Sequence, residues 1–369
     1  RAAYQAGRGY ANQDTPESNQ KAIERFARAE KWHPEHSFAD DARLRQAEVW
    51  EKLADRNTPN AAEKMTELLS TLPAKYRTGD MRAEALWRLA WRAWRAHDYE
   101  TTIEWLDKQI AAVPHDDNYW AEGQAQYWKA RAYEKLDMGE RARASYEECV
   151  RKYPLSYYSL LALNRVRESH PKLLQRLLGD VRKAPPGWSP GAPAFTFAPR
   201  PIYSEPGFLR AVELLKLGLG EAAGRELAKL GLQVPTGRAK VTDPDKAEQL
   251  WATALLYDRA GRYDKSHWIT RWSVLDYKVS WPTEANQPRW KIAYPKAWWH
   301  LIAPAAKREG YAPELLVSFV REESAFDPIL ESFANAIGLT QMILPTANRF
   351  GKGLGFEITR ENLRDPEKN

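Results

Sequence analysis

Apolar and small residues recur every three or four positions through the first part of the chain, the period of a helix with one buried face. Proline closes successive helical patterns at Pro34, Pro73, Pro114 and Pro154, at intervals of 39, 41 and 40 residues. A fixed period of this length is the signature of a repeat architecture. We therefore predict that residues 1–170 form a superhelical stack of α-hairpins.

The unit that ends at Pro154 indicates how such hairpins pack. A helix over residues 127–133 is followed by Ala142, Tyr146 and Cys149, a spacing that resembles a tetratricopeptide-type helix pair. Small residues let paired helices approach, and aromatic residues fill the gap to the next repeat. We expect Cys149 to be buried. As the single cysteine, it excludes an internal disulfide and a cysteine-based zinc site.

Tryptophan is concentrated in the preceding unit, at Trp87, Trp91 and Trp94. Spacings of four and three place the three indoles on one face of a helix. A sugar-binding face is one interpretation of this stripe. We favour packing between repeats, because an apolar stripe at helical spacing normally faces a core.

Proline then interrupts the helical pattern, with eight prolines between residues 171 and 206. Proline lacks an amide hydrogen and fixes its backbone, so we predict that 171–206 is an extended connector. Helical periodicity returns over 207–295, a predicted helical linker domain with helices at about 245–259 and 263–275. A last domain is predicted over 296–369. Two-residue alternation is absent from the sequence, so the fold class is all-α.

Composition narrows the class of protein. Sixteen Trp and seventeen Tyr in 369 residues exclude a disordered chain. No apolar run approaches the roughly 20 residues of a membrane-spanning helix. The chain opens at Arg1 without a leader, which is compatible with a secretory signal that has been removed.

Charge and histidine content bear on partners and metals. The net charge of +6 is spread along the chain, which suits any polyanionic partner: nucleic acid, anionic lipid or a carboxylate-bearing cell-wall glycan. Nucleic acid is disfavoured, because there is no basic run or nucleic-acid-binding motif. His33 and His36 flank Pro34, which breaks helical spacing, so we expect a surface loop there and no metal site.

One carboxylate stands out on a helix predicted to begin at Pro313. At 100° per residue, Glu323 falls in the middle of the apolar face, whereas Glu322 falls at its edge. Desolvation raises the pKa of a carboxyl group, as a general acid near neutral pH requires. A structural hydrogen-bonding role is the alternative. The apolar face consists of Leu315, Leu316, Phe319 and Val320.

Further motifs follow in order. Glu323-Ser324 precedes Gly338-Leu339-Thr340-Gln341, and then comes Pro345-Thr346-Ala347. Each fragment is weak alone, but the ordered set resembles the soluble lytic transglycosylase family, whose catalytic domain resembles goose-type lysozyme. The resemblance covers about residues 296–369, and larger periplasmic members also have a long superhelical N-terminal region. It implies an α-superhelical repeat stack followed by a lysozyme-like α domain.

The resemblance implies roles for individual residues. Glu323 corresponds to the family's sole catalytic carboxylate, and Ser324 to its partner in the first motif. Gly338 suits a close approach of backbone and glycan, and Gln341 corresponds to a glutamine beside the catalytic glutamate. The implied substrate-binding residues are Ser324, Ser332, Gly338, Gln341 and Ile343.

The implied reaction uses one carboxylate in place of the usual pair. Glu323 would protonate the oxygen between N-acetylmuramic acid and N-acetylglucosamine, while the muramic acetamide stabilises the anomeric centre. The resulting carboxylate would remove the C6 hydroxyl proton, and that oxygen closes a 1,6-anhydro ring without consuming water. The implied partner is a peptidoglycan glycan strand in the periplasm or cell envelope, and no metal or cofactor is expected.

One departure concerns the family's third motif, an Ala-Tyr-Asn or similar cluster, which would come after Asn369. We therefore expect an incomplete lysozyme-like domain and poor activity of residues 1–369 alone. Two other hypotheses remain: a catalytically inactive helical-repeat scaffold that binds protein partners or glycan, and a lysozyme-like hydrolase. Glu323→Gln is expected to remove anhydro product, and Glu322→Gln to leave activity largely intact.

Overall fold

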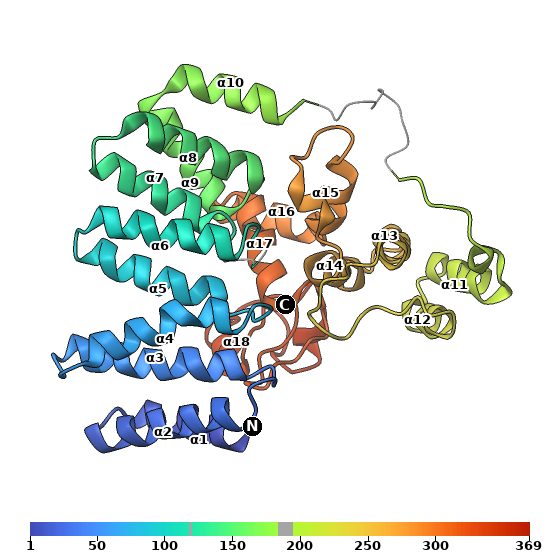
Figure 1. Cartoon of the computed structure of the whole chain (residues 1–369). Coiled ribbons are helices and arrows are strands. Elements are labelled where there is room, and N and C mark those ends of the chain that lie inside the picture. The colour runs from blue at the N-terminus through green and yellow to red at the C-terminus, as the bar shows by residue number, and fades with distance from the viewer. Residues whose placement is uncertain (117, 119, 184–194) are drawn as a thin grey trace. The chain divides into compact units, whose positions relative to one another are not determined.

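The computed structural model describes residues 1–116, 118, 120–183 and 195–369 (Figure 1). The chain divides into two compact units, Arg1–Val181 and Arg182–Asn369. The all-α prediction is confirmed, because the described residues form helices and, beyond them, only isolated bridges at Glu331–Ile337 and Ile337–Met342.

The first unit is a succession of antiparallel helices, each packed against the next along the chain (Figure 1). This arrangement agrees with the predicted stack of α-hairpins. The helices are α1 (Ala2–Gln13), α2 (Pro16–Trp32), α3 (Ala39–Asp55), α4 (Ala61–Lys75), α5 (Arg82–Arg95), α6 (Tyr99–Ala112), α7 (Gln124–Lys135), α8 (Gly139–Lys152), α9 (Tyr157–Ser169) and α10 (Pro171–Val181).

The packing of α7 against α8 follows the small-and-aromatic spacing. Ala142, Tyr146 and Cys149 are all buried, as predicted. Gly123, at the start of α7, has a φ of 82°, and a Cβ there would meet the Cys149 sulfur at 2.8 Å. The Cys149 thiol donates to the Gly123 carbonyl at 3.4 Å. Burial raises the pKa of this thiol, so Cys149 is a packing residue.

The tryptophan stripe lies between two repeats. The Trp128 ring, from α7, meets Trp91 and Trp94 of α5 edge-on, with both centroid distances 4.9 Å. Trp87 stacks on Trp91 at 5.4 Å. All four indoles are half-buried. The structure thus supports the packing interpretation of the stripe.

The second unit is built from shorter helices. Its elements are η1 (Pro201–Ser204), α11 (Pro206–Lys216), α12 (Gly220–Lys229), α13 (Pro244–Arg259), α14 (Tyr263–Trp272), η2 (Asp276–Val279), α15 (Gln287–Ala293), α16 (Trp299–Arg308), α17 (Pro313–Ser324), α18 (Leu344–Phe350) and η3 (Asn362–Arg364). One core cluster centres on Trp251 and Trp290, and a second joins Ile302, Val320 and Phe326. The second cluster positions the end of α17.

The predicted connector needs a correction. Its first part forms α10, because Pro171 occupies the first helical turn, where no amide hydrogen is needed, and buried Leu173 and Leu177 follow at helical spacing. Prolines 185–193 lie outside the described residues. Beyond them the chain runs without a helix to Arg200, and Phe195 and Phe197 pack on the Trp251 cluster. The boundary predicted at residue 296 stays a prediction.

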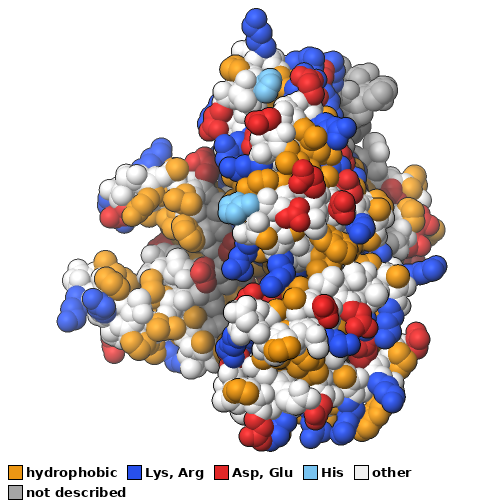
Figure 2. Space-filling view, turned by 60° about the vertical axis from the view of Figure 1, so that its left-hand side comes forward, with side chains coloured by type: hydrophobic (Ala, Val, Ile, Leu, Met, Phe, Trp, Pro, Cys, Tyr) orange, Lys and Arg blue, Asp and Glu red, His pale blue; other side chains and the backbone are white. Residues whose placement is uncertain are grey.

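Charges of both signs are mixed over the surface. Figure 2 shows one face on which Lys and Arg alternate with Asp and Glu and with hydrophobic side chains. Many of them form ion pairs, such as Arg88 with Glu48 at 2.7 Å and with Glu51 at 2.9 Å. This face carries no continuous basic stripe of the kind that nucleic-acid binding requires.

Three carboxylates meet where α3 begins. Oxygens of Asp40, Asp41 and Asp80 lie within 4.8 Å of one another. Burial, and then repulsion from Asp80 and Asp40, raises the pKa of Asp41 from 3.8 to about 6. Ionising Asp41 is therefore harder in the folded chain than in the unfolded one, so folding stability is lost as the pH rises from about 4 to about 6.

We expect Asp41→Asn to stabilise the protein at pH 7 by about 1 kcal/mol, after allowance for solvent screening at this half-buried site. The gain should largely vanish below about pH 3, where the carboxyl is mostly protonated in both states. Chemical denaturation followed by circular dichroism at both pH values measures it. Asp137→Asn, at an exposed position, is the control. An equal gain at both pH values would contradict the assignment.

Candidate active site

Glu323 lies on the last turn of α17, but not in the buried setting predicted for it. Its side chain is exposed, and on the same face Leu315 and Phe319 are 49% and 57% exposed. The buried side of α17 is centred on Val320 and Ser324, both 2% exposed. The apolar stripe is wider than the surface that neighbouring helices cover. The expected desolvation of Glu323 is therefore not provided by the described residues.

The chain reverses sharply directly after Glu323. The Ser324 hydroxyl is buried and donates to the Val320 carbonyl of its own helix at 3.1 Å. Ala325 and Phe326 both have positive φ, 50° and 69°. Two successive left-handed non-glycine residues are strained, and such strain concentrates at functional sites.

Buried contacts hold this turn in place. The Phe326 ring is 2% exposed and lies edge-on to His267, with centroids 5.5 Å apart. The Trp298 indole donates to the Phe326 carbonyl at 3.3 Å. His267 is fully buried, and its Nδ1 donates to the Ala293 carbonyl at 2.9 Å. The strained turn after α17 is thus held by His267 of α14 and by Trp298, which directly precedes α16. His267 is itself fixed by its hydrogen bond to α15.

Two adjacent carboxylates have different surroundings. Glu322 accepts from Arg271 at 2.7 Å and from Arg321 at 2.9 Å. Glu323 has no ion pair among the described residues, so its carboxylate is available for other chemistry. The two glutamates therefore differ in their contacts: Glu322 is ion-paired, and within the described residues Glu323 is not.

The loop that follows contains the other predicted site residues. The Ser332 hydroxyl accepts from the Ala336 amide at 3.1 Å and closes a tight loop. The Gln341 side chain donates to the carbonyls of Leu330 and Gly338, both at 3.1 Å. These two side chains order the loop, and within the part of the chain that the structure describes the Gln341 amide bonds to these carbonyls and not to Glu323. Ile343, 40% exposed, immediately precedes α18.

Gly338 lies against this chain's own backbone. It has a φ of 78°, and a Cβ there would clash with the Leu363 carbonyl oxygen. This close approach by itself requires glycine at residue 338, and a contact with glycan stays a prediction. The Asn369 side chain completes the lock, because it donates to the carbonyls of Ile337 and Leu363 and accepts from Thr340.

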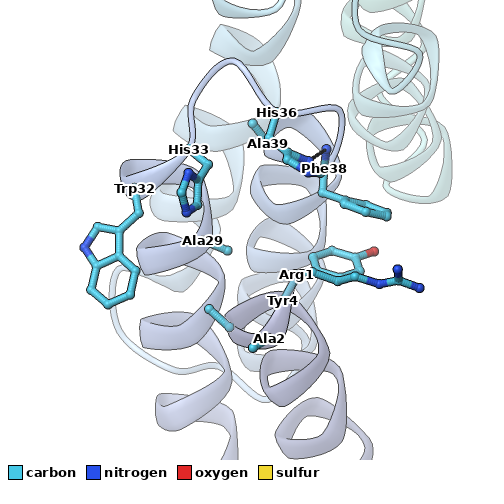
Figure 3. Close-up of a pocket in the computed structure, with 10 residues that line it drawn as sticks. Arg1, Ala2, Tyr4, Ala29, Trp32, His33, His36, Phe38 and Ala39 are labelled. Atoms are coloured by element: carbon cyan, nitrogen blue, oxygen red, sulfur yellow. Dashed lines mark hydrogen bonds between the residues drawn. The ribbon is translucent and has the colours of Figure 1, made fainter.

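The predicted histidine loop lies in the first unit. His36 accepts from the Phe38 amide at 3.1 Å and stacks on the Phe38 ring. Figure 3 shows His33 and His36 beside a small apolar cavity of about 170 Å³, with Tyr4 nearby. Among the described residues, only the three aspartates near the start of α3 group like metal ligands. The histidines do not form such a group.

The part of the chain that contains Glu323 is similar to known proteins. The family profile of the transglycosylase SLT domain matches residues 300–369. Membrane-bound lytic murein transglycosylase C of Actinobacillus pleuropneumoniae serotype 5b (strain L20) is 40% identical over 72 residues, 19% of this chain and 20% of that protein. Its Haemophilus influenzae (strain PittGG) namesake is 42% identical over 72 residues, with the same two shares. Residues 300–369 therefore carry a transglycosylase SLT domain related to lytic murein transglycosylases.

Solved structures show the same fold along the whole chain. The 70 kDa soluble lytic transglycosylase of Escherichia coli matches with a TM-score of 0.51 and 19% identity, over 96% of this chain and 51% of that one. An inactive mutant of lytic transglycosylase Slt from Pseudomonas aeruginosa matches at 0.50 and 16%, over 100% and 59%. The chain thus spans about half of those structures and a fifth of the curated relatives.

Some contributors to the site had no signal in the sequence. His267 and Arg271 lie more than fifty residues before Glu323 and match no motif. Asn369 reaches the Gly338 loop only through the fold. No helix among the described residues is long and apolar enough to cross a membrane.

We expect Gly338→Ala to destabilise the second unit by roughly 3 kcal/mol or more, because it combines left-handed strain with a clash against backbone. Gly310→Ala is a matched control, since Gly310 has a φ of 77° and open space around its Cα. That variant should cost only the strain, about 1 kcal/mol. Denaturant unfolding compares the two, and equal costs would contradict the proposed clash.

Burial, and then the nearby Arg321, lowers the pKa of His267 from 6.5 to about 3. The unfolded chain takes up this proton near pH 6.5 and the folded chain does not. Folding stability is therefore lost as the pH falls from 6.5 toward 3. In His267→Leu the melting temperature should depend less on pH over that window, whereas exposed His300→Leu should leave the dependence unchanged. Equal slopes in all three proteins would contradict the assignment.

Proposed function

We propose that the protein is a peptidoglycan lytic transglycosylase and that Glu323 is its single acid and base. The observation that carries the proposal is the position of Glu323: within the SLT match, on the last turn of α17, before a strained turn that buried residues hold. Neighbouring Glu322 is engaged by two arginines, which leaves Glu323 as the carboxylate free to react.

In the proposed reaction, protonated Glu323 donates its proton to the oxygen that links N-acetylmuramic acid to N-acetylglucosamine. The bond from the muramic anomeric carbon to that oxygen breaks, and the N-acetylglucosamine end leaves as an alcohol. The Glu323 carboxylate then accepts the proton of the muramic C6 hydroxyl, whose oxygen bonds to the anomeric carbon. Glu323 ends protonated again, and no water is consumed.

The remaining predicted site residues divide by their contacts. We assign Ser332, Gly338 and Gln341 to holding the loop that borders the site, because their polar groups or close contacts are made within the chain. Ile343 and the exposed Phe319 remain available to contact a sugar face. Ser324 is assigned to packing.

The proposed substrate and location are a glycan strand in the periplasm or cell envelope. The curated relatives are named membrane-bound lytic murein transglycosylases, and one matching structure of the soluble enzyme is a complex with bulgecin A. The helical repeats of the first unit would serve as a docking surface for strands or protein partners, since stacked repeats present extended surfaces.

We expect Glu323→Gln to abolish release of 1,6-anhydro-muropeptides from purified sacculi. The amide can neither donate a proton to the linking oxygen nor accept the proton of the C6 hydroxyl. Glu314→Gln, exposed on the first turn of the same helix, is the control and should retain activity. Mass spectrometry of the products, with the longest expressed form containing residues 1–369, is the measurement. Reducing ends in place of anhydro ends would indicate a hydrolase. Anhydro product from Glu323→Gln would remove the assignment.

A further inference from the structure

A cluster of charged side chains links the end of α17 to α14, and both helices belong to the second unit. Arg271, on α14, donates through Nη2 to the Glu322 carboxylate at 2.7 Å. Arg321 donates to the other oxygen of the same carboxylate at 2.9 Å. The two arginine side chains are each 15% exposed, whereas that of Glu322 is 40% exposed. The Glu322 carboxylate is thus partly exposed and bound by two arginine side chains that are largely buried.

The same arginines make further contacts around the turn. The Arg271 Nη1 lies 3.5 Å from the Arg321 carbonyl oxygen, at the limit of a hydrogen bond. The Arg321 guanidinium lies over the ring of Tyr294, 4.4 Å from its centroid. Tyr294 immediately follows α15, so the last turn of α17 is connected to both α14 and α15.

The energetics of this ion pair indicate a geometric role. A half-exposed salt bridge contributes little to the free energy of folding, because solvent screens it and its side chains lose entropy. The burial of Phe326 already stabilises the turn. The Arg271–Glu322 pair instead fixes an orientation. It connects the residue before Glu323 to α14, a helix that packs into the hydrophobic core.

We propose that Arg271 and Glu322 are positioning residues for the acid Glu323. Through this pair, helix α14 fixes the orientation of the end of α17, where Glu323 lies. This inference rests on the proposed function of Glu323. Displacing a catalytic group by about 1 Å can cost roughly 10²-fold in rate. Loss of the pair should consequently lower kcat, while the melting temperature should stay nearly unchanged.

The test is a double-mutant cycle with Arg271→Met, Glu322→Ala and the double variant. Methionine keeps an aliphatic stem but removes the guanidinium, which also lies over the Trp272 ring, 5.1 Å from its centroid. We expect each single variant to lower kcat for anhydro-product release about 10-fold, with KM within about twofold and the melting temperature nearly unchanged. The double variant should be no slower than the slower single, because the two changes remove one interaction.

Conservative variants separate positioning from a general structural role. Glu322→Gln keeps an oxygen that accepts from Arg271 and should retain most of kcat. Arg271→Lys keeps the charge without the planar fork and should fall between. Arg200→Met and Glu248→Ala break a similarly exposed ion pair of the second unit and should leave kcat unchanged. Additive losses, or losses that track the melting temperature, would overturn the proposal.

A second readout does not depend on activity. Hydrogen exchange of the backbone amides of residues 322–326 should quicken in Arg271→Met and Glu322→Ala and not in the control pair. If the parent protein releases no anhydro product, the proposed function fails while this exchange result still decides whether the pair orders the turn. Unchanged exchange together with unchanged kcat would remove the positioning role.

Discussion

The ring of Phe326 lies against His267 in the core of the second unit, and the geometry of the candidate site depends on that contact. Phe326 has a left-handed backbone, as does Ala325 before it, and such residues persist only when their surroundings fix them. His267 supplies the fixed partner because it is fully buried and bonded to the Ala293 carbonyl. These left-handed residues end α17 at Ser324, one residue after Glu323.

The regular parts of the fold could be predicted from the sequence because their causes are local. The prolines recur about every 40 residues, and the structure has hairpins there. Pro34, Pro114 and Pro154 each follow the end of a helix as predicted, whereas the prediction was wrong for Pro73, which lies inside α4. Pro313 at a helix start and the motif at Pro345 likewise mark α17 and α18. The prediction of an extended connector was wrong over α10. The prolines are not evenly distributed over residues 171–206, and the first part of that stretch has proline only at its start, where a helix tolerates it.

The site was predictable as a set of residue types but not as a set of contacts. Helical periodicity identified an apolar stripe around Glu323, yet it gave no information on which side a neighbour would cover. The covering residues, Ile302 and Leu339, belong to other segments. Gly338 shows the same limit: its positive φ is a local property, but the carbonyl that excludes a side chain comes from Leu363. Long-range packing decides both.

The pair Glu322 and Glu323 shows how neighbouring identical side chains acquire separate tasks. They point in directions 100° apart on the helix, so one faces Arg271 and Arg321 while the other faces exposed Phe319. Glu322 is held by two arginines, whereas Glu323 is exposed and has no ion pair among the described residues. The residue that anchors the end of α17 and the residue proposed to transfer protons are therefore different side chains, so the contacts of Glu322 leave the Glu323 carboxylate accessible.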